Sequence, residues 1–117
     1  MLFLEYPPCT TCKKAKKWLQ DHGLEFTARH IKECSPTAAE LALWQEKSGL
    51  ELKKFFNTSG MLYRELGLKD KLPTLSREEQ FQLLASDGML VKRPILVTED
   101  TVLVGFKEKD WEKLLQK

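Results

Sequence analysis

The sequence predicts an α/β fold in which a four-stranded mixed sheet carries an all-helical insert at about residues 37–88. Three observations lead to this expectation. An apolar run at residues 2–4 leads to a pair of cysteines and then to a segment with helical periodicity. The middle of the chain contains helix starts and turns. Two short apolar runs, residues 95–98 and 102–104, then precede a closing helix.

The N-terminal part predicts a strand, a helix and a second strand. The apolar run at residues 2–4 is typical of a buried central strand. From Cys12 onward Ala15 and Leu19 follow at helical spacing, and Gly23 is placed to end this helix. Residues 25–31 alternate well enough for the second strand.

Two capping boxes predict helix starts in the middle of the chain. Thr37 with Glu40 and Ser76 with Glu79 have the required spacing. We expect Leu41 and Trp44 on the buried face of the first of these helices, and Phe81 and Leu84 on that of the second. Between the two helices, a turn at residues 57–60 should separate short helical pieces at residues 52–56 and 61–66.

The C-terminal part predicts a hairpin followed by a helix. Residues 99–100 supply the turn between the two short strands, and the helix begins at about Lys107 with Trp111, Leu114 and Leu115 on its apolar side. The resulting order of elements is the thioredoxin architecture. We expect one domain, residues 1–117, with sheet halves at 1–34 and 89–117.

Composition narrows the class of protein. Hydrophobic residues make up 42% and charged residues 31% of the 117 residues, and the net charge of +2 is too small to favour direct nucleic-acid binding. Glu5 interrupts the apolar start, so no signal peptide is expected, and no apolar run reaches membrane-spanning length. Three cysteines, an odd number, favour a cytoplasmic protein that is neither secreted nor membrane-bound.

The two cysteines of the CxxC sequence are the leading candidates for chemistry. Cys9 falls at the start of the first helix, where free N–H groups and the helix dipole favour the thiolate, so it is the predicted nucleophile. Cys12, one turn further, could attack a mixed disulfide formed at Cys9. Two alternatives stay open: both cysteines could be structural, or Cys9, Cys12, Cys34 and His30 could bind zinc.

The sequence resembles the ArsC-like family, which comprises glutaredoxin-dependent arsenate reductases and relatives such as the Spx-type transcription regulators. The resemblance is carried, in order, by the run Pro7-x-Cys9-x-x-Cys12-Lys13-Lys14-Ala15, by residues 63–68, and by the runs Lys92-Arg93-Pro94-Ile95 and Leu103-Val104-Gly105-Phe106. It implies a thioredoxin-like fold with a reactive thiol at Cys9 and an arginine, Arg93, beside it. In thioredoxin folds the proline at the place of Pro94 is typically cis and faces the active thiol.

In the arsenate reductases of this family, three arginines hold the arsenate. Only Arg93 carries over, because the other two places fall near Asn57 and near Gly105, which have no guanidinium. Arsenate reductases commonly have serine at the place of Cys12 and take their second thiol from glutathione and glutaredoxin. The second cysteine here is similar to that of the Spx-type regulators, in which the pair can act as a redox switch.

We therefore expect an arsenate reductase-family thiol–disulfide oxidoreductase acting on a small oxyanion or a disulfide. Glutathione with glutaredoxin, or thioredoxin, would be the reductant, and no bound cofactor or metal is expected. The alternative is an Spx-like, non-enzymatic regulator that contacts the RNA polymerase α subunit. Cys34 is expected to be an incidental surface thiol. The expected anion-binding and substrate-binding residues are Thr10, Thr11, Lys13, Arg93 and Pro94.

Overall fold

A computed structural model describes residues 1–115 of the chain. Its centre is a four-stranded mixed sheet in the order β2-β1-β3-β4, with β1 parallel to β2 and antiparallel to β3. The strands are β1 Leu2–Glu5, β2 Thr27–His30, β3 Ile95–Val97 and β4 Val102–Val104. The predicted fold class and the central place of the first strand are confirmed.

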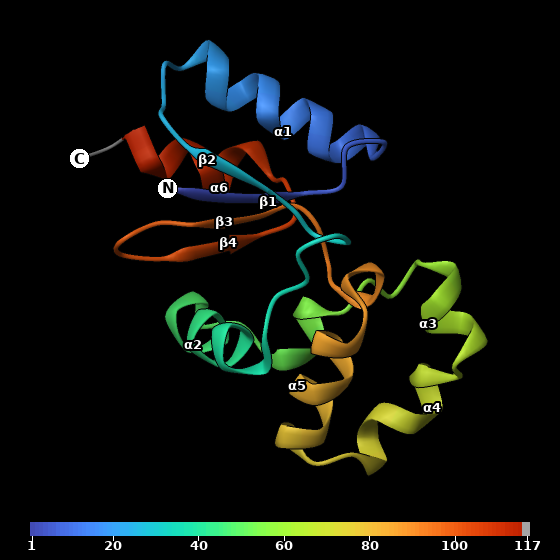
Figure 1. Cartoon of the computed structure of the whole chain (residues 1–117). Coiled ribbons are helices and arrows are strands. Elements are labelled where there is room, and N and C mark those ends of the chain that lie inside the picture. Colours follow the sequence, from blue (N-terminus) through green and yellow to red (C-terminus); the bar gives the residue numbers. More distant parts are fainter. Residues whose placement is uncertain (116–117) are drawn as a thin grey trace.

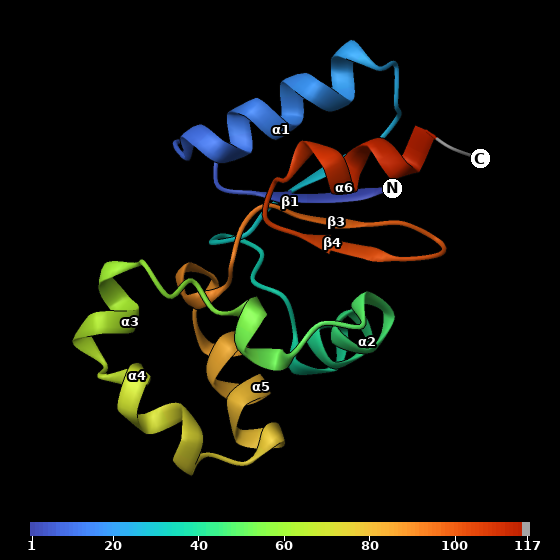
Figure 2. The same ribbon diagram turned by 180° about the vertical axis from the view of Figure 1, so that it is seen from behind.

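The helices are divided between the two faces of the sheet (Figures 1 and 2). α1 Thr10–Asp21 and α6 Glu108–Glu112 lie on one face. The insert, on the other side, contains α2 Ala38–Ser48, η1 Leu52–Phe55, α3 Met61–Glu65, α4 Leu68–Lys71, η2 Leu72–Thr74, α5 Arg77–Ser86 and η3 Gly88–Leu90. None of the helices within residues 1–115 has the length and apolar character needed to cross a bilayer.

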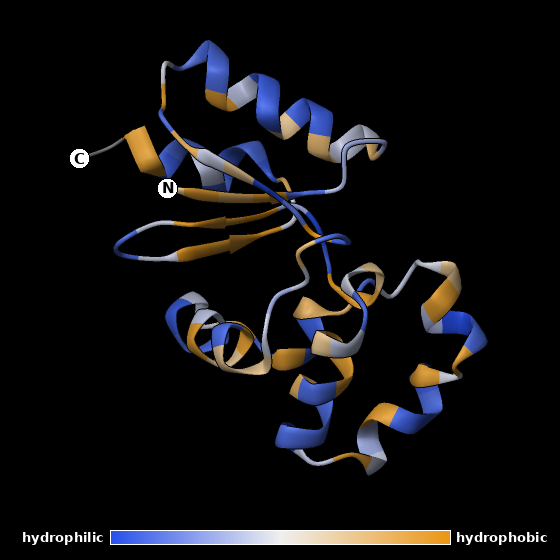
Figure 3. Ribbon diagram, viewed as in Figure 1, coloured by the Kyte–Doolittle hydropathy of each residue, from blue (hydrophilic) through white to orange (hydrophobic). Residues whose placement is uncertain are grey.

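Successive side chains of the central strands point to opposite faces of the sheet and join two hydrophobic cores. Phe3 pairs with Leu96, and both side chains join the core beneath α1 and α6. Leu4 pairs with Ile95, and this pair joins the core shared with the insert. Figure 3 shows β1, β3 and β4 as largely hydrophobic, as expected for strands that are covered on both sides.

Trp111 anchors the closing helix to this sheet. Its ring packs edge-on against Trp18 of α1 and Phe106, with ring centroids 5.9 and 4.9 Å away. The buried indole N–H donates to the Gly105 carbonyl at 3.2 Å, so the polar atom of this side chain is satisfied inside the core.

Both predicted capping boxes are present. In α2 the Glu40 N–H donates to the Thr37 hydroxyl at 3.1 Å, and the Glu40 carboxylate accepts from the Thr37 N–H. Ser76 and Glu79 make the same exchange at the start of α5. The four side chains predicted to face inward from these helices are all buried: Leu41, Trp44, Phe81 and Leu84.

The structure corrects the sequence analysis at several points. Leu115 is 45% exposed and does not belong to the apolar side of the closing helix, which ends in a short 3₁₀ turn, η4 Lys113–Leu115. The short helices α4 and η3 were not anticipated, nor was η2, whose Pro73 occupies a first-turn position.

Replacing Thr37 with alanine tests the α2 capping box. Thr37→Ala should lower the free energy of unfolding by about 1 kcal/mol, because the Glu40 N–H loses its acceptor. Urea denaturation followed by circular dichroism measures this change. Thr58→Ala, at an exposed turn position, is the matched control and should be nearly neutral; equal losses in both variants would contradict the capping role.

Candidate thiol redox site

Cys9 lies at the junction between β1 and α1. The chain turns after β1, and the Cys9 N–H donates to the Tyr6 carbonyl at 2.8 Å. Cys9 is the N-cap residue of α1, with an extended backbone, and its Sγ accepts a hydrogen bond of 3.4 Å from the Cys12 N–H. The sulfur thus takes the place that an oxygen fills in most helix caps.

Arg93, just before β3, lies close to Cys9. The Arg93–Pro94 peptide is cis, as expected, and leads directly into β3, the neighbour of β1. The guanidinium carbon lies 5.0 Å from the centroid of the Tyr6 ring, a cation–π contact that fixes the side chain next to the thiol. Tyr6 was not anticipated as a site residue.

The pKa of Cys9 is lowered from its ordinary value of 9.0. Burial by itself raises this pKa, but the hydrogen bonds from Cys12 and the charge of Arg93 together outweigh burial. Ionisation of Cys9 therefore stabilises the fold. That contribution is complete above the ordinary thiol pKa and is lost as the pH falls through the lowered pKa of the folded protein.

Cys12 has the opposite electrostatic character. Its side chain is fully buried on the inner face of α1, and burial, reinforced by the neighbouring Cys9 thiolate, raises its pKa to about 12. Of the two cysteines, Cys9 therefore loses its proton first, and Cys12 remains a thiol. All three cysteines of the chain are free in this structure.

Two donors of Arg93 have no acceptor in the described part of the chain. Nε and Nη1 are buried, and no atom within residues 1–115 accepts a hydrogen bond from either. Leaving a buried donor without a partner costs roughly 1–3 kcal/mol, so an acceptor supplied from outside the chain would stabilise this arrangement. An anion or a carbonyl oxygen next to Cys9 has the right chemistry.

The remaining predicted site residues differ in their exposure to solvent. Thr10, Thr11 and Lys13 are exposed on the first turn of α1, next to Cys9 in the chain, whereas Pro94 is buried. Asn57 donates its backbone N–H to the Leu90 carbonyl at the edge of the insert. Gly105 has a φ of 76° and donates its N–H to Pro94, directly beside the Arg93 peptide.

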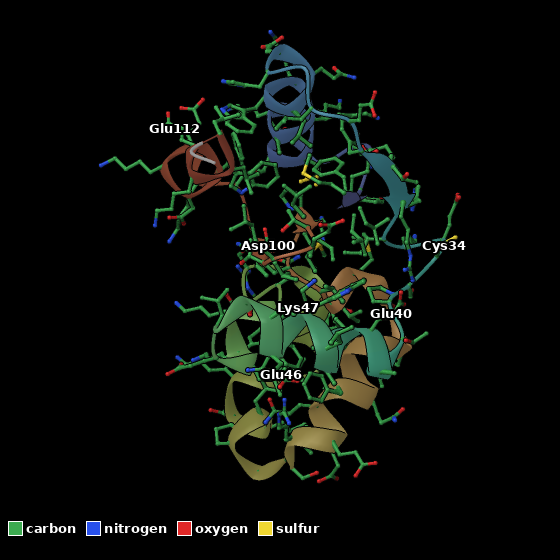
Figure 4. All side chains as sticks on the ribbon, turned by 90° about the vertical axis from the view of Figure 1, so that its left-hand side faces the viewer. Cys34, Glu40, Glu46, Lys47, Asp100 and Glu112 are labelled. Atoms are coloured by element: carbon green, nitrogen blue, oxygen red, sulfur yellow. The ribbon has the colours of Figure 1, made fainter. Side chains whose placement is uncertain are left out.

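The hypothetical zinc ligands are not brought together. Within residues 1–115 no group of three or more His, Cys, Asp or Glu side chains is placed to bind a metal ion. His30 Nδ1 accepts from the N–H groups of Lys32 and Glu33, each at 3.2 Å. Cys34 is exposed at the side of the molecule near Glu40 (Figure 4), where Arg29 Nε donates to its carbonyl.

Glu5 and Lys16 form an ion pair that the sequence analysis also missed. Lys16 Nζ lies 3.1 Å from Glu5 Oε2, and the Glu5 side chain is 10% exposed. Lys16 is four residues after Cys12, so the two project from the same side of α1. Two features of the sequence could have indicated this ion pair. Lys16 is four residues after Cys12, and Glu5 is a carboxylate at the end of an apolar strand.

Comparison with known proteins places the chain in a family. Residues 4–114 match the model of the ArsC family. The chain belongs to the ArsC family. It is 58% identical to the Bacillus subtilis protein YusI over 97% of this chain and 96% of that protein. It is 30% identical to the global transcriptional regulator Spx of Lactiplantibacillus plantarum over 93% of this chain and 81% of Spx.

Among solved structures, a possible arsenate reductase from Streptococcus mutans superimposes with a TM-score of 0.86. The two chains are 52% identical, and the match covers 95% of this chain and 96% of the other. This ArsC family member is therefore similar both to a protein named as a possible enzyme and to a protein named as a regulator.

Substitution of Arg93 tests the electrostatic part of this site. In a Cys34→Ser background, which removes the exposed thiol, Arg93→Gln should raise the pKa of Cys9 because the neutral side chain no longer favours the thiolate. The rate of alkylation by iodoacetamide as a function of pH measures this pKa. At pH 7 the rate should fall several-fold.

Arg64→Gln is the matched control for this experiment. Arg64 is an exposed arginine of α3 in the insert, and its replacement should leave the alkylation profile unchanged. If both variants shifted the profile equally, Arg93 would have no specific effect on the Cys9 thiolate.

Proposed function

We propose that this ArsC family protein is a thiol–disulfide oxidoreductase in which Cys9 is the nucleophile and Cys12 the resolving thiol. The observation that carries the proposal is that Cys9 accepts a hydrogen bond which favours its thiolate, while Cys12 is a buried thiol. The Cys12 N–H donates to Cys9 Sγ, while the Cys12 side chain lies fully buried behind it. Cys9 thus lies nearer the surface, where a nucleophile would meet its substrate, and Cys12 lies behind it, where a resolving thiol would be protected.

In the first step, the Cys9 thiolate attacks one sulfur of a substrate disulfide. A bond forms between Cys9 Sγ and that sulfur, the substrate disulfide breaks, and the other substrate sulfur leaves as a thiolate that can take up a proton. The lowered pKa of Cys9 increases the fraction of thiolate available for this step.

In the second step, Cys12 loses its proton and attacks Cys9 Sγ. This releases the remaining substrate thiolate and forms a Cys9–Cys12 disulfide, so two electrons pass from the pair to the substrate. Cys9 carries no charge in the mixed disulfide. The part of the raised Cys12 pKa that depends on the Cys9 thiolate is then lost, while Arg93 still favours the Cys12 thiolate. The first step thus prepares the second.

The oxidised pair must then be reduced by an external thiol. Glutathione with glutaredoxin, or thioredoxin, would supply two electrons and return both cysteines to the reduced form. The same pair could reduce arsenate: Cys9 would form a sulfur–arsenic bond with loss of water, and attack by Cys12 would release arsenite.

Disulfides are the better-supported substrates. An arsenate oxyanion needs several charged donors, and of the three places Asn57, Arg93 and Gly105 only one carries a guanidinium. A disulfide requires only a thiolate, a resolving thiol and room for the leaving group. We therefore expect slow arsenate turnover beside efficient disulfide reduction.

The similarity to Spx favours a second candidate function. At 30% identity over 93% of this chain, the L. plantarum protein is named a global transcriptional regulator. In this alternative the Cys9–Cys12 pair is a redox switch, and the protein contacts the RNA polymerase α subunit without catalysing a reaction. The buried position of Cys12 suits a switch as well as an enzyme. A Cys9–Cys12 disulfide would draw this buried residue towards the start of α1 and so change the structure of the first turn.

Cysteine variants separate the two roles in the enzyme. With glutathionylated peptide as substrate, Cys9→Ser should abolish reduction, whereas Cys12→Ser should accumulate a mixed disulfide at Cys9, detectable by intact-protein mass spectrometry. Cys34→Ser is the control and should retain activity, because Cys34 is an exposed thiol in the loop after β2 and not part of α1. Arsenate is tested as the second substrate, with glutathione and glutaredoxin, or thioredoxin, as the reductant.

Activity that survives in Cys9→Ser would contradict the nucleophile assignment. A Cys12→Ser variant that releases product at the wild-type rate without an adduct would instead contradict the resolving role. Reduction of arsenate as fast as disulfide would overturn the expected preference between the two substrates.

Co-purification tests the regulator alternative. If the protein acts as a regulator, tagged protein should retain the RNA polymerase α subunit, and oxidation of the Cys9–Cys12 pair should change the amount retained. Binding is measured with purified α subunit under reducing and oxidising conditions, with Cys12→Ser as the variant that cannot form the bridge. Absence of binding under both conditions would reject this alternative.

A further inference from the structure

A basic groove runs along the outer edge of β4. It has a volume of about 1000 Å³ and lies between the α2–η1 segment on one side and α6 on the other. Figure 4 places Asp100, at the β3–β4 turn, between α6, marked by Glu112, and α2, marked by Lys47. All three residues of β4 line the groove.

The outer edge of β4 offers backbone groups to a partner. β4 is the last strand of the sheet and pairs only with β3 within residues 1–115. On the inner side, Gly105 N–H donates to Pro94 and Thr98 N–H donates to Thr101, at 2.8 and 2.9 Å. In an antiparallel pair the bonded positions alternate, so the N–H and C=O groups of Val102 and Val104 point away from β3.

The groove is rimmed by more positive than negative side chains. Its lysines are Lys53, Lys54, Lys92, Lys107 and Lys113, and its acidic residues are Glu51, Asp100 and Asp110. Lys113 lies 4.0 Å from Asp110, but the other four lysines form no ion pair within residues 1–115. The Lys92 side chain lies beside the end of β4, since its Cε is 3.6 Å from the position that a Cβ on Gly105 would occupy.

We propose that this groove binds an extended acidic segment of a partner protein, which adds to β4 as a fifth strand. The outward groups of Val102 and Val104 would form the main-chain hydrogen bonds, and the lysines would pair with acidic side chains of the added strand. The backbone groups of the edge do not distinguish one sequence from another, so the excess of positive charge would select an acidic segment. The proposal does not depend on the chemistry of Cys9.

The side chains of β4 are also suited to this role. Val104 and Leu103 are half-buried rather than fully covered, so an added strand would bury apolar surface on both sides of the edge. Short edge strands discourage pairing with unrelated chains, because few backbone bonds are available to hold them. A charged rim adds the affinity and selectivity that such a short edge lacks.

Binding of a model peptide tests the proposal. The probe is a short fluorescein-labelled peptide of alternating glutamate and valine, titrated with the full chain by fluorescence anisotropy. We expect saturable binding, together with changed amide resonances and slowed hydrogen exchange at Val102 and Val104. The same peptide with lysine for glutamate, and one with N-methylated backbone amides, should bind at least about tenfold more weakly.

Lysine variants assign the charge effect to the groove. Lys53→Glu combined with Lys54→Glu should weaken binding of the acidic peptide by roughly tenfold. The matched control is Lys69→Glu combined with Lys71→Glu, which changes two exposed lysines of α4 by the same charge and should leave binding unchanged. Urea denaturation establishes that both double variants fold.

Three results would overturn the proposal. The first is that the acidic peptide shows no saturable binding. The second is that the N-methylated peptide or the lysine peptide binds as tightly as the acidic peptide. The third is that the control variant loses as much affinity as the groove variant. Self-association that protects the Val102 amide without any peptide would also overturn it, because the occupant of the edge would then be a second copy of this chain.

Discussion

The hydrogen bond from the Cys12 N–H to Cys9 Sγ joins the fold to its chemistry. It caps α1, so the helix begins where β1 has just ended, and it fixes the sulfur at the positive end of the helix. A thiolate accepts this bond more strongly than a thiol does. The same contact therefore stabilises the start of the helix and the ionised form of Cys9, and a change to either affects the other.

The sheet order supplies the second half of the site. β1 and β3 are neighbours, so the loop after β1 and the segment before β3 reach the same end of the sheet. This brings Tyr6 beneath the Arg93 guanidinium and Arg93 close to Cys9. Two buried donors of Arg93 have no acceptor among the described residues 1–115, an arrangement that favours a bound ligand over an empty site.

Local rules were enough to predict much of this structure. The capping boxes at Thr37 and Ser76 were found because their residues lie close together in the sequence, and the central strand because its apolar run is continuous. The placement of Cys9 at the start of α1 followed from the same kind of local reasoning. The position of Arg93 was expected only through the resemblance to ArsC proteins, which supplied the long-range information that spacing lacks.

What the sequence did not predict depends on contacts between distant segments. Tyr6 shows no site signal until β1 and β3 are paired, because Arg93 is far from it along the chain. Leu115 fits a helical apolar stripe, but the helix changes to a 3₁₀ turn before reaching it and rotates the side chain towards solvent.

The contact between Gly88 and Ile31 brings the two ends of the helical insert together. A Cβ on Gly88 would overlap the Ile31 carbonyl oxygen, so the chain leaves the sheet after β2 and returns before β3 at almost the same point. Phe56 and Val91 form a β-bridge close to this point. Because the two ends of the helical segment meet, a change in its length or shape would not by itself require β1 or β3 to move.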